Sequence, residues 1–207
     1  MQVGLLTYYS KNRSPLMKKL FFVIALIAAI GVNAATPVYL DDSKPLEDRV
    51  EDALSRMTLR EKINLIHAQS KFSAPGVPRL GIPEIWCTDG PMGVRPEVLW
   101  DEWEQAKWTN DSCTAFPSLT ALAATWDPDM ALLYGKSIGE EARYRNKSVL
   151  LGPGINIYRT PLNGRNFEYM GEDPYLTSQM VVPYVKGVQS NGVAACVKHF
   201  ALNNNEI

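Results

Sequence analysis

The stretch that most constrains the fold is VAACVKHF, residues 193–200. Its first five residues are apolar and too few for a helix, so they predict a strand buried on both faces. Lys198 and His199 follow directly, and neither side chain can be buried without a partner. Neighbouring strand residues face opposite sides, so both reach one pocket only where the backbone leaves regular strand geometry. We expect such a functional strand end; the alternative places Lys198 in solvent at the rim and His199 hydrogen-bonded in the core.

Two other short apolar runs also end in polar residues. Residues 82–87 lead to the turn sequence TDGP at 88–91, and residues 149–151 lead through GPG to a polar segment at 156–168. Continuous apolar strands that alternate with helices are typical of parallel sheets, in which ligands bind at the carboxyl ends of the strands. We therefore expect the three polar clusters to contribute to one site.

Amphipathic stretches supply the helices of this alternation. Two Asp-Pro pairs, at 127–128 and 173–174, each combine an N-cap with a first-turn proline. TLRE at 58–61 predicts a capping box after a helical repeat over 46–57. Pro183 predicts a kink or a displaced hydrogen bond in the last helix. The buried stripe expected after the first Asp-Pro pair is Met130, Leu133, Tyr134, Ile138 and Ala142.

The first 34 residues have the composition of a secretory signal peptide. A basic start precedes an apolar run of 13 residues, Leu20 to Val32, and small residues precede a cleavage point after Ala34. So short a run does not span a hydrocarbon core of about 30 Å, which disfavours a retained membrane anchor. We expect a mature domain over 35–207, a secreted or periplasmic location, and no stable membrane insertion after cleavage.

Charge and cysteine usage exclude several classes of function. Removal of the leader takes away four basic residues and no acidic ones, so the net charge moves from −1 to −5. With no basic cluster after Ala34, nucleic acid is not an expected partner. The three cysteines show no CxxC spacing and the chain has two histidines, so no metal and no cofactor is expected. Cys87 and Cys113 can pair in an oxidising compartment, but we expect buried free thiols.

Individual side chains at the predicted strand ends suit carbohydrate binding. Asp89 can accept hydrogen bonds from two neighbouring hydroxyls, or it can serve only its own turn. Arg165 presents five donors in a fixed fork, and Glu168 is spaced to orient it; the alternative is a surface ion pair. Three loop tryptophans can stack on sugar faces, although such residues more often cover an apolar edge. They are Trp100, Trp103 and Trp108.

Taken in order, these motifs resemble the N-terminal domain of glycoside hydrolase family 3, from about Met57 to the last residue. The resemblance implies a (β/α)8 TIM-barrel-like domain, usually followed by an α/β sandwich domain. The 173 residues after the leader fall short of the roughly 250 of a barrel, so we expect an incomplete, truncated barrel. The matching segments are MTLREKI (57–63), RLGIP (79–83), TDGPMGVR (88–95), FP (116–117), AATW (123–126), LGPGIN (151–156), GRNFEY (164–169), EDP (172–174), and KHF (198–200) with Asn204 and Glu206.

The family resemblance also implies an activity. It indicates a retaining, exo-acting β-glucosidase that releases β-D-glucose from the non-reducing end of β-linked glucosides or oligosaccharides in carbohydrate catabolism. It assigns sugar binding to Asp89, Arg165, Lys198 and His199. The run GRNFEY favours the β-glucosidase branch, with a β-xylosidase or another exo-β-glycosidase of the family as the alternative. A non-catalytic sugar-binding fragment is a further alternative.

The catalytic carboxyl groups of the family lie on later segments. A retaining site needs two of them about 5–5.5 Å apart, and Asp89 is the one pocket candidate here. We therefore expect the nucleophile and the acid/base beyond Ile207, and this chain to be a fragment that is inactive alone. A barrel enzyme in which Lys198 forms a Schiff base is the alternative from another class.

Overall fold

The structure is a computed structural model that describes residues 36–100, 102–107 and 111–206. The described residues divide into two compact units, with the boundary between Arg56 and Met57. In the first, the 3-10 helix η1 (Val38–Leu40) precedes α3 (Leu46–Arg56), and the backbone N–H of Tyr39 donates to the Asp52 carboxylate at 3.1 Å. The predicted helix over 46–57 is confirmed. The predicted signal peptide and Trp108 lie outside the described residues.

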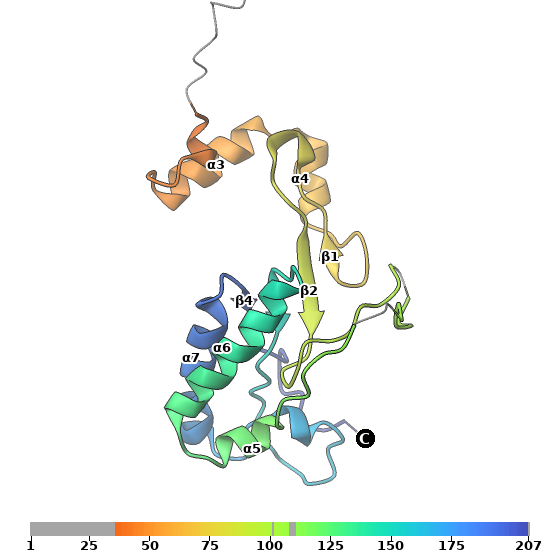
Figure 1. Cartoon of the computed structure of the whole chain (residues 1–207), viewed down its shortest axis with the longest axis vertical. Coiled ribbons are helices and arrows are strands. Elements are labelled where there is room, and N and C mark those ends of the chain that lie inside the picture. The colour runs from red at the N-terminus through yellow and green to blue at the C-terminus, as the bar shows by residue number, and fades with distance from the viewer. Residues whose placement is uncertain (1–35, 101, 108–110, 207) are drawn as a thin grey trace, which may run out of the picture. The chain divides into compact units, whose positions relative to one another are not determined.

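The second unit is an α/β structure (Figure 1). Its sheet has four strands in the order β1-β2-β3-β4, of which β2, β3 and β4 are parallel and β1 is antiparallel to β2. The register places Asp89 beside Leu151 and Leu150 beside Ala195. In chain order the elements are α4 (Leu59–Leu65), β1 (Ser73–Ala74), η2 (Pro78–Leu80), β2 (Ile85–Asp89), α5 (Leu119–Ala123), α6 (Pro128–Tyr144), β3 (Val149–Leu151), η3 (Asn166–Glu168), α7 (Pro174–Gln189) and β4 (Ala194–Ala195).

The predicted caps form as the sequence indicates. Thr58 accepts from the backbone of Glu61 and Glu61 accepts in return, which completes the capping box of α4. Asp127 caps α6 through two backbone N–H groups, and Asp173 caps α7 through one. Helix α7 continues through Pro183 from Pro174 to Gln189 without interruption.

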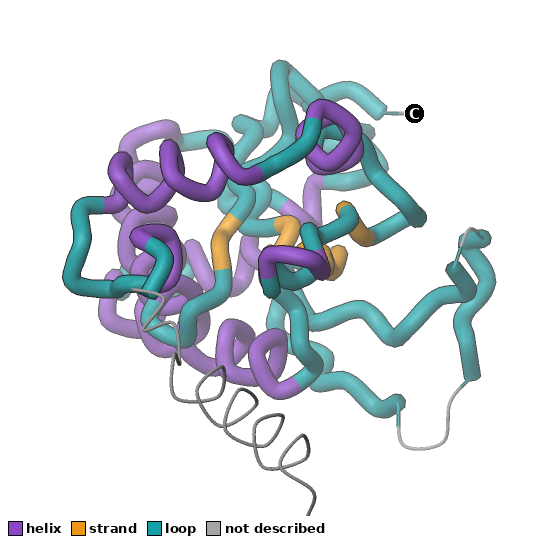
Figure 2. The backbone as a smooth tube through the Cα atoms, turned by 90° about the horizontal axis from the view of Figure 1, so that it is seen from above, coloured by secondary structure: helices purple, strands orange, loops and turns teal. Residues whose placement is uncertain are grey.

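Helices α6 and α7 pack side by side against the parallel strands (Figures 1 and 2). Glycines allow the approach: a Cβ at Gly187 would lie 2.4 Å from the carbonyl oxygen of Leu132, and one at Gly135 would lie 2.1 Å from that of Tyr184. Because these small residues set the contact face, Met130 and Leu133 turn outward and are 42% and 55% exposed. The predicted stripe is wrong at these two positions. The large residues that the core buries completely include Leu119, Ile138, Leu150, Met180, Tyr184 and Val188.

Two predicted strands differ in extent from the observed ones. The run at 82–87 contributes β2 only from Ile85, because Ile82 instead pairs with Val77 in a tight reversal. The run at 193–197 forms a strand over Ala194–Ala195, after which the chain bridges to Gly154 at Lys198. Strand β1 and helix α5 were not predicted. Their short sequences carry no periodic apolar pattern.

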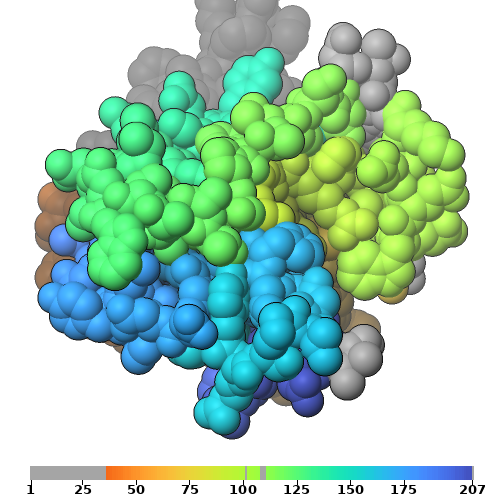
Figure 3. All heavy atoms as spheres, turned by 90° about the horizontal axis from the view of Figure 1, so that it is seen from below, coloured from red at the N-terminus to blue at the C-terminus, as the bar shows by residue number. Residues whose placement is uncertain are grey.

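The segment between β2 and α5 leaves the sheet as a long loop excursion (Figure 2). Side chains near the end of α6 fasten it: Arg145 pairs with Asp111, and Lys147 pairs with Glu97 at 2.5 Å. On another face, α5 meets the segment that leads into α7 (Figure 3), where the Thr120 hydroxyl donates to the Tyr169 carbonyl at 3.1 Å. Two ion pairs therefore anchor the described parts of this loop to the end of α6.

The structure also shows the state of the cysteines and whether any described helix could span a membrane. All three cysteines are free thiols, so Cys87 and Cys113 do not pair. The expectation of buried thiols is wrong: Cys87 and Cys113 are half-buried, and Cys196 is exposed just past the short strand β4. Within residues 36–206 as described, no helix has the combined length and apolar character needed to cross a membrane.

Candidate functional site

The carboxyl ends of β2 and β4 bring Asp89 and Lys198 together. Asp89 is the last residue of β2, and Lys198 lies three residues past β4. The Lys198 ammonium lies 3.0 Å from Asp89 Oδ1 and 3.2 Å from Glu168 Oε2. The Lys198 and Glu168 side chains are only 13% and 10% exposed, so each charge is buried with a partner, as buried charges require.

Asp89 both stabilises its own turn and contacts Lys198. Its Oδ1 accepts from the backbone N–H of Gly90 at 3.0 Å, and Gly90 adopts a φ of +119° that favours glycine. Its Oδ2 lies 3.9 Å from an Arg95 nitrogen, and the side chain is 40% exposed. The two interpretations drawn from the sequence are therefore compatible, because Oδ1 serves both the turn and Lys198, while the side chain as a whole stays partly exposed.

Arg165 and Glu168 form a bidentate pair across the single turn of η3. The Arg165 Nε and Nη2 donate to the two Glu168 oxygens at 2.6 and 3.0 Å, as the predicted pairing requires. Arg165 Nη1 also donates to Glu206 at 3.1 Å. Glu168, through this hydrogen bonding, raises the pKa of Arg165 above its ordinary value. Burial raises the pKa of Glu168, but the Arg165 hydrogen bond and the Lys198 charge outweigh it, and the net shift is downward.

His199 completes the cluster in a defined tautomer. Its Nε2 lies 2.7 Å from Arg165 Nη2, and arginine has no acceptor, so Nε2 must accept. Its Nδ1 then carries the hydrogen and donates to the Tyr169 hydroxyl at 2.8 Å. Burial, together with the charges of Lys198 and Arg165, lowers the pKa of His199 below its ordinary value of 6.5. The imidazole is therefore neutral at pH 7.

The irregular backbone at Lys198-His199 is held by a neutral side chain. Asn156 accepts from the His199 backbone N–H at 2.6 Å and donates to the His199 carbonyl at 3.1 Å. The sequence prediction that two neighbouring residues reach one pocket outside regular strand geometry is confirmed at this point, since β4 has already ended. Asn156 and Tyr169 were not predicted as site residues.

All five residues predicted for the site thus form one connected cluster: Asp89, Lys198, Glu168, Arg165 and His199. Open hollows flank it. One of about 640 Å³ is lined by Asp89, Glu168 and the loop after β2, and another of about 500 Å³ is lined by Lys198, His199 and the segment after β3. A cluster that joins carboxylates to an amine and a guanidinium offers both acceptors and donors, which is what a ligand with several hydroxyls requires.

Parallel strands with a polar cluster at their carboxyl ends are typical of α/β proteins, in which ligands bind at the strand ends. Residues 78–205 match the glycosyl hydrolase family 3 N terminal domain, and the chain belongs to this family. It is 71% identical over 182 residues to the β-glucosidase BoGH3A of Bacteroides ovatus, an alignment that covers 88% of this chain and 24% of that protein.

More distant relatives agree with this assignment. The chain is 47% identical over 158 residues to thermostable β-glucosidase B of Acetivibrio thermocellus, covering 76% of this chain and 21% of that protein. It also resembles the solved structure of β-glucosidase 3B from Thermotoga neapolitana in complex with glucose, with a TM-score of 0.65 and 40% identity over 75% of this chain and 23% of that one. The chain therefore spans about a quarter of the length of the relatives it matches.

Proposed function

We propose that the protein carrying this chain is a retaining, exo-acting β-glucosidase, and that Asp89, Arg165, Lys198 and His199 hold the terminal glucose. The observation that carries the proposal is their convergence: Lys198 contacts both Asp89 and Glu168, and Arg165 contacts both Glu168 and His199. Family membership and the names of the relatives support hydrolysis of a β-glucoside. In this proposal β2, β3 and β4 belong to a barrel that further strands complete.

Each side chain has a role that its contacts allow. Lys198 and Arg165 donate hydrogen bonds to sugar hydroxyls, and the open oxygen of Asp89 accepts from the hydroxyls farthest from the cleaved bond. His199 lies toward the hydroxyls nearer that bond. Glu168 is a positioning residue, because its bidentate bond to Arg165 and its contact with Lys198 fix both cations.

The bond-breaking groups in this proposal come from elsewhere in the longer protein. A retaining mechanism needs a nucleophile and an acid/base, two carboxyl groups about 5–5.5 Å apart. Asp89 and Glu168 both form ion pairs with Lys198, and this engagement suits them to holding the sugar and its cationic partners rather than to attacking the glycosidic bond. We also propose a secreted or periplasmic location, which the composition of the first 34 residues supports.

The test uses the protein expressed from its complete coding sequence, with p-nitrophenyl β-glucoside and β-xyloside as substrates. We expect glucoside hydrolysis, and transfer of the glycosyl group to methanol as the β-anomer. An Asp89→Asn variant should lose most of kcat/KM, whereas an Asp129→Asn control on the exposed first turn of α6 should not. Cleavage of the xyloside alone would overturn the glucosidase assignment, and binding of glucose without turnover would favour a non-catalytic sugar-binding protein.

A further inference from the structure

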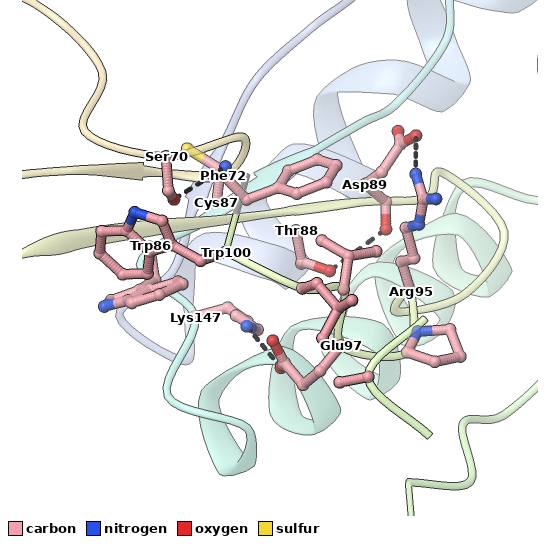
Figure 4. Close-up of a pocket in the computed structure, with 14 residues that line it drawn as sticks. Ser70, Phe72, Trp86, Cys87, Thr88, Asp89, Arg95, Glu97, Trp100 and Lys147 are labelled. Carbon is pink, nitrogen blue, oxygen red and sulfur yellow. Dashed lines mark hydrogen bonds and ion pairs between the residues drawn. The ribbon is translucent and has the colours of Figure 1, made fainter. Parts of the chain in front are cut away.

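A largely buried ion pair fastens the start of the loop that follows β2 (Figure 4). The Lys147 ammonium lies 2.5 Å from Glu97 Oε1, and the two side chains are 6% and 17% exposed. The same ammonium lies 5.2 Å from the centre of the Trp86 ring. Neither Lys147 nor Glu97 lines the hollow beside Glu168, so the pair stands outside the proposed sugar site.

A second ion pair fastens the other limb of the same loop. Arg145 pairs with Asp111, and these side chains are 12% and 10% exposed. The Asp111 carboxylate also accepts from the backbone N–H of Glu97 at 2.8 Å, which ties the two limbs to each other. We call the two pairs, Lys147–Glu97 and Arg145–Asp111, the loop-base ion pairs.

Stability alone explains such buried ion pairs poorly. Taking charges out of water carries a large desolvation cost, and apolar residues of similar volume in their place are often neutral or stabilising. Apolar packing lacks direction, however, whereas a charge-assisted hydrogen bond fixes a particular acceptor atom against a particular donor. The loop-base ion pairs are therefore better explained by the position that they impose on neighbouring residues.

The residues next to Glu97 lead directly to the strand-end cluster. The Arg95 backbone N–H donates to the Asp89 carbonyl at 3.1 Å, and an Arg95 guanidinium nitrogen lies 3.9 Å from Asp89 Oδ2 (Figure 4). Pro96 separates Arg95 from Glu97, and a proline restricts both its own φ and the backbone of the residue before it. Because this connection is short and stiff, a displacement of Glu97 would move Arg95 with it.

The second limb also reaches the hollow without an intervening flexible stretch. Residues 111–115 line the hollow together with Asp89, Arg95 and Glu168. Asp111 is thus at once the anchored residue of this limb and the first residue of that wall. Both walls of the hollow that come from the loop begin at a loop-base ion pair.

We propose that the loop-base ion pairs are positioning groups for the sugar site. They touch no sugar, but they fix the loop so that Arg95 stays against the Asp89 carboxylate, and that carboxylate stays set for the hydroxyls farthest from the cleaved bond. The inference rests on the proposed function, which places the terminal glucose at Asp89. Loss of a pair should then weaken the grip on the glucose ring more than it slows the chemistry at the bond.

The test removes the pair next to Arg95 without leaving a buried charge. Glu97→Met and Lys147→Met are made together in the complete protein, which replaces the pair by apolar side chains of similar length. We expect KM for p-nitrophenyl β-glucoside and the inhibition constant of glucose to rise about tenfold, while kcat stays within about threefold, because binding far from the cleaved bond is lost equally in the ground state and the transition state. The melting temperature should change little.

The matched control makes the same two exchanges farther along the same loop. Glu104 and Lys107 form an ion pair at 2.8 Å, but their side chains are 57% and 73% exposed. Glu104→Met with Lys107→Met should change neither KM nor the melting temperature, because an exposed pair of this kind contributes little. A rise in KM in this control equal to that at Glu97 and Lys147 would overturn the proposal.

A second variant keeps both buried charges. Glu97→Asp shortens the carboxylate by one methylene group, so it displaces the loop without removing the ion pair, and KM should rise several-fold. Partial unfolding cannot imitate this result, because it reduces the amount of active enzyme and thus the apparent kcat, and it leaves KM unchanged. A fall in kcat or in melting temperature with KM unchanged in both variants would make the pair merely structural and overturn the proposal. If the wild-type protein neither hydrolyses the glucoside nor binds glucose, the proposed function itself fails.

Discussion

At the scale of single residues, Lys198 is the connection on which the cluster depends. Its ammonium joins two carboxylates that come from separate strands and loops, Asp89 and Glu168. Removal of one partner from a buried ion pair leaves the other charges uncompensated, at a cost of about 3–5 kcal/mol. The network is thus more sensitive to loss of one member than the number of its contacts suggests.

Substitution of Lys198 by methionine tests this dependence. Lys198→Met keeps the approximate length of the side chain but removes the charge. Asp89 and Glu168 then lose their shared donor, and Asp89 keeps only the longer contact with Arg95 while Glu168 keeps Arg165. We expect kcat/KM on p-nitrophenyl β-glucoside to fall by roughly 10²-fold or more. The ratio of the two kcat/KM values measures the transition-state stabilisation that is lost. The control is Lys186→Met at the exposed end of α7, which should stay within twofold of wild type. Near-normal activity of Lys198→Met would remove Lys198 from the site.

Protonation of the His199 imidazole should make sugar binding depend on pH. Its pKa is lowered, first by burial and then by Lys198 and Arg165, with Glu168 and Glu206 acting in the opposite sense. The neutral ring accepts from Arg165; once protonated it cannot accept and faces two cations. Binding is therefore intact above the ordinary pKa of 6.5 and is lost as pH falls through the lower pKa of the folded protein. The inhibition constant of glucose should rise several-fold below that range, and His199→Gln should flatten this part of the profile.

The charged members of the cluster were predictable from the sequence, and its neutral members were not. Lys198, Arg165 and Asp89 are polar residues placed directly after apolar runs or beside glycine, which is a visible anomaly. Asn156 and Tyr169 act through one or two hydrogen bonds at positions where Asn and Tyr are unremarkable. The signal that could have identified Asn156 is its place in the polar segment after β3, directly behind the GPG turn.

At the scale of elements, the helices were predicted better than the strands. Asp127 and Asp173 set the starts of α6 and α7 through local side-chain hydrogen bonds, which a sequence shows directly. The end of β4 depends on its pairing with β3 and on the bridge between Gly154 and Lys198, which are distant in the chain. The face of α6 was misassigned at Met130 and Leu133 because glycines, not large apolar residues, define its contact with α7.

The contact between α6 and α7 gives a prediction about stability. Gly187→Ala would place a Cβ 2.4 Å from the Leu132 carbonyl oxygen, and backbone on both sides leaves no flexible side chain to yield. Overpacking of this kind costs about 1–3 kcal/mol. We expect a lower midpoint in chemical denaturation of the complete protein, monitored by far-ultraviolet circular dichroism. Gln189→Ala at the exposed end of α7 should change the midpoint little. An unchanged midpoint for Gly187→Ala would show that the helices can separate at little cost.

At the scale of the whole molecule, the parallel strands align the polar cluster, and apolar side chains on and around the sheet are exposed. The strands align three polar strand ends. This alignment allows Lys198 to donate a hydrogen bond to Asp89, which lies 109 positions earlier in the chain. Among the described residues, Ile85 and Val197 on and beside the strands are 45% and 46% exposed, and Leu59 and Ile66 on and beside α4 are 74% and 85% exposed. Surfaces of this kind are normally covered by further structure, and the relatives are about four times longer.

A polypeptide limited to residues 57–206 should therefore be poorly folded when it is produced alone. Strand β4 would present an unpaired edge, and the exposed apolar side chains would add to its tendency to associate. We expect strong binding of an apolar fluorescent dye, elution as aggregates in size-exclusion chromatography and a broad thermal transition, whereas the complete protein should show none of these. Adding glucose should not sharpen the transition, because the apparent affinity for glucose falls with the small fraction of molecules that hold the folded, binding-competent site. A monomeric sample that binds no dye and melts cooperatively would instead show that three parallel strands and their helices suffice as an independent folding unit. Binding of glucose to the five-residue cluster could then be measured directly in that isolated segment.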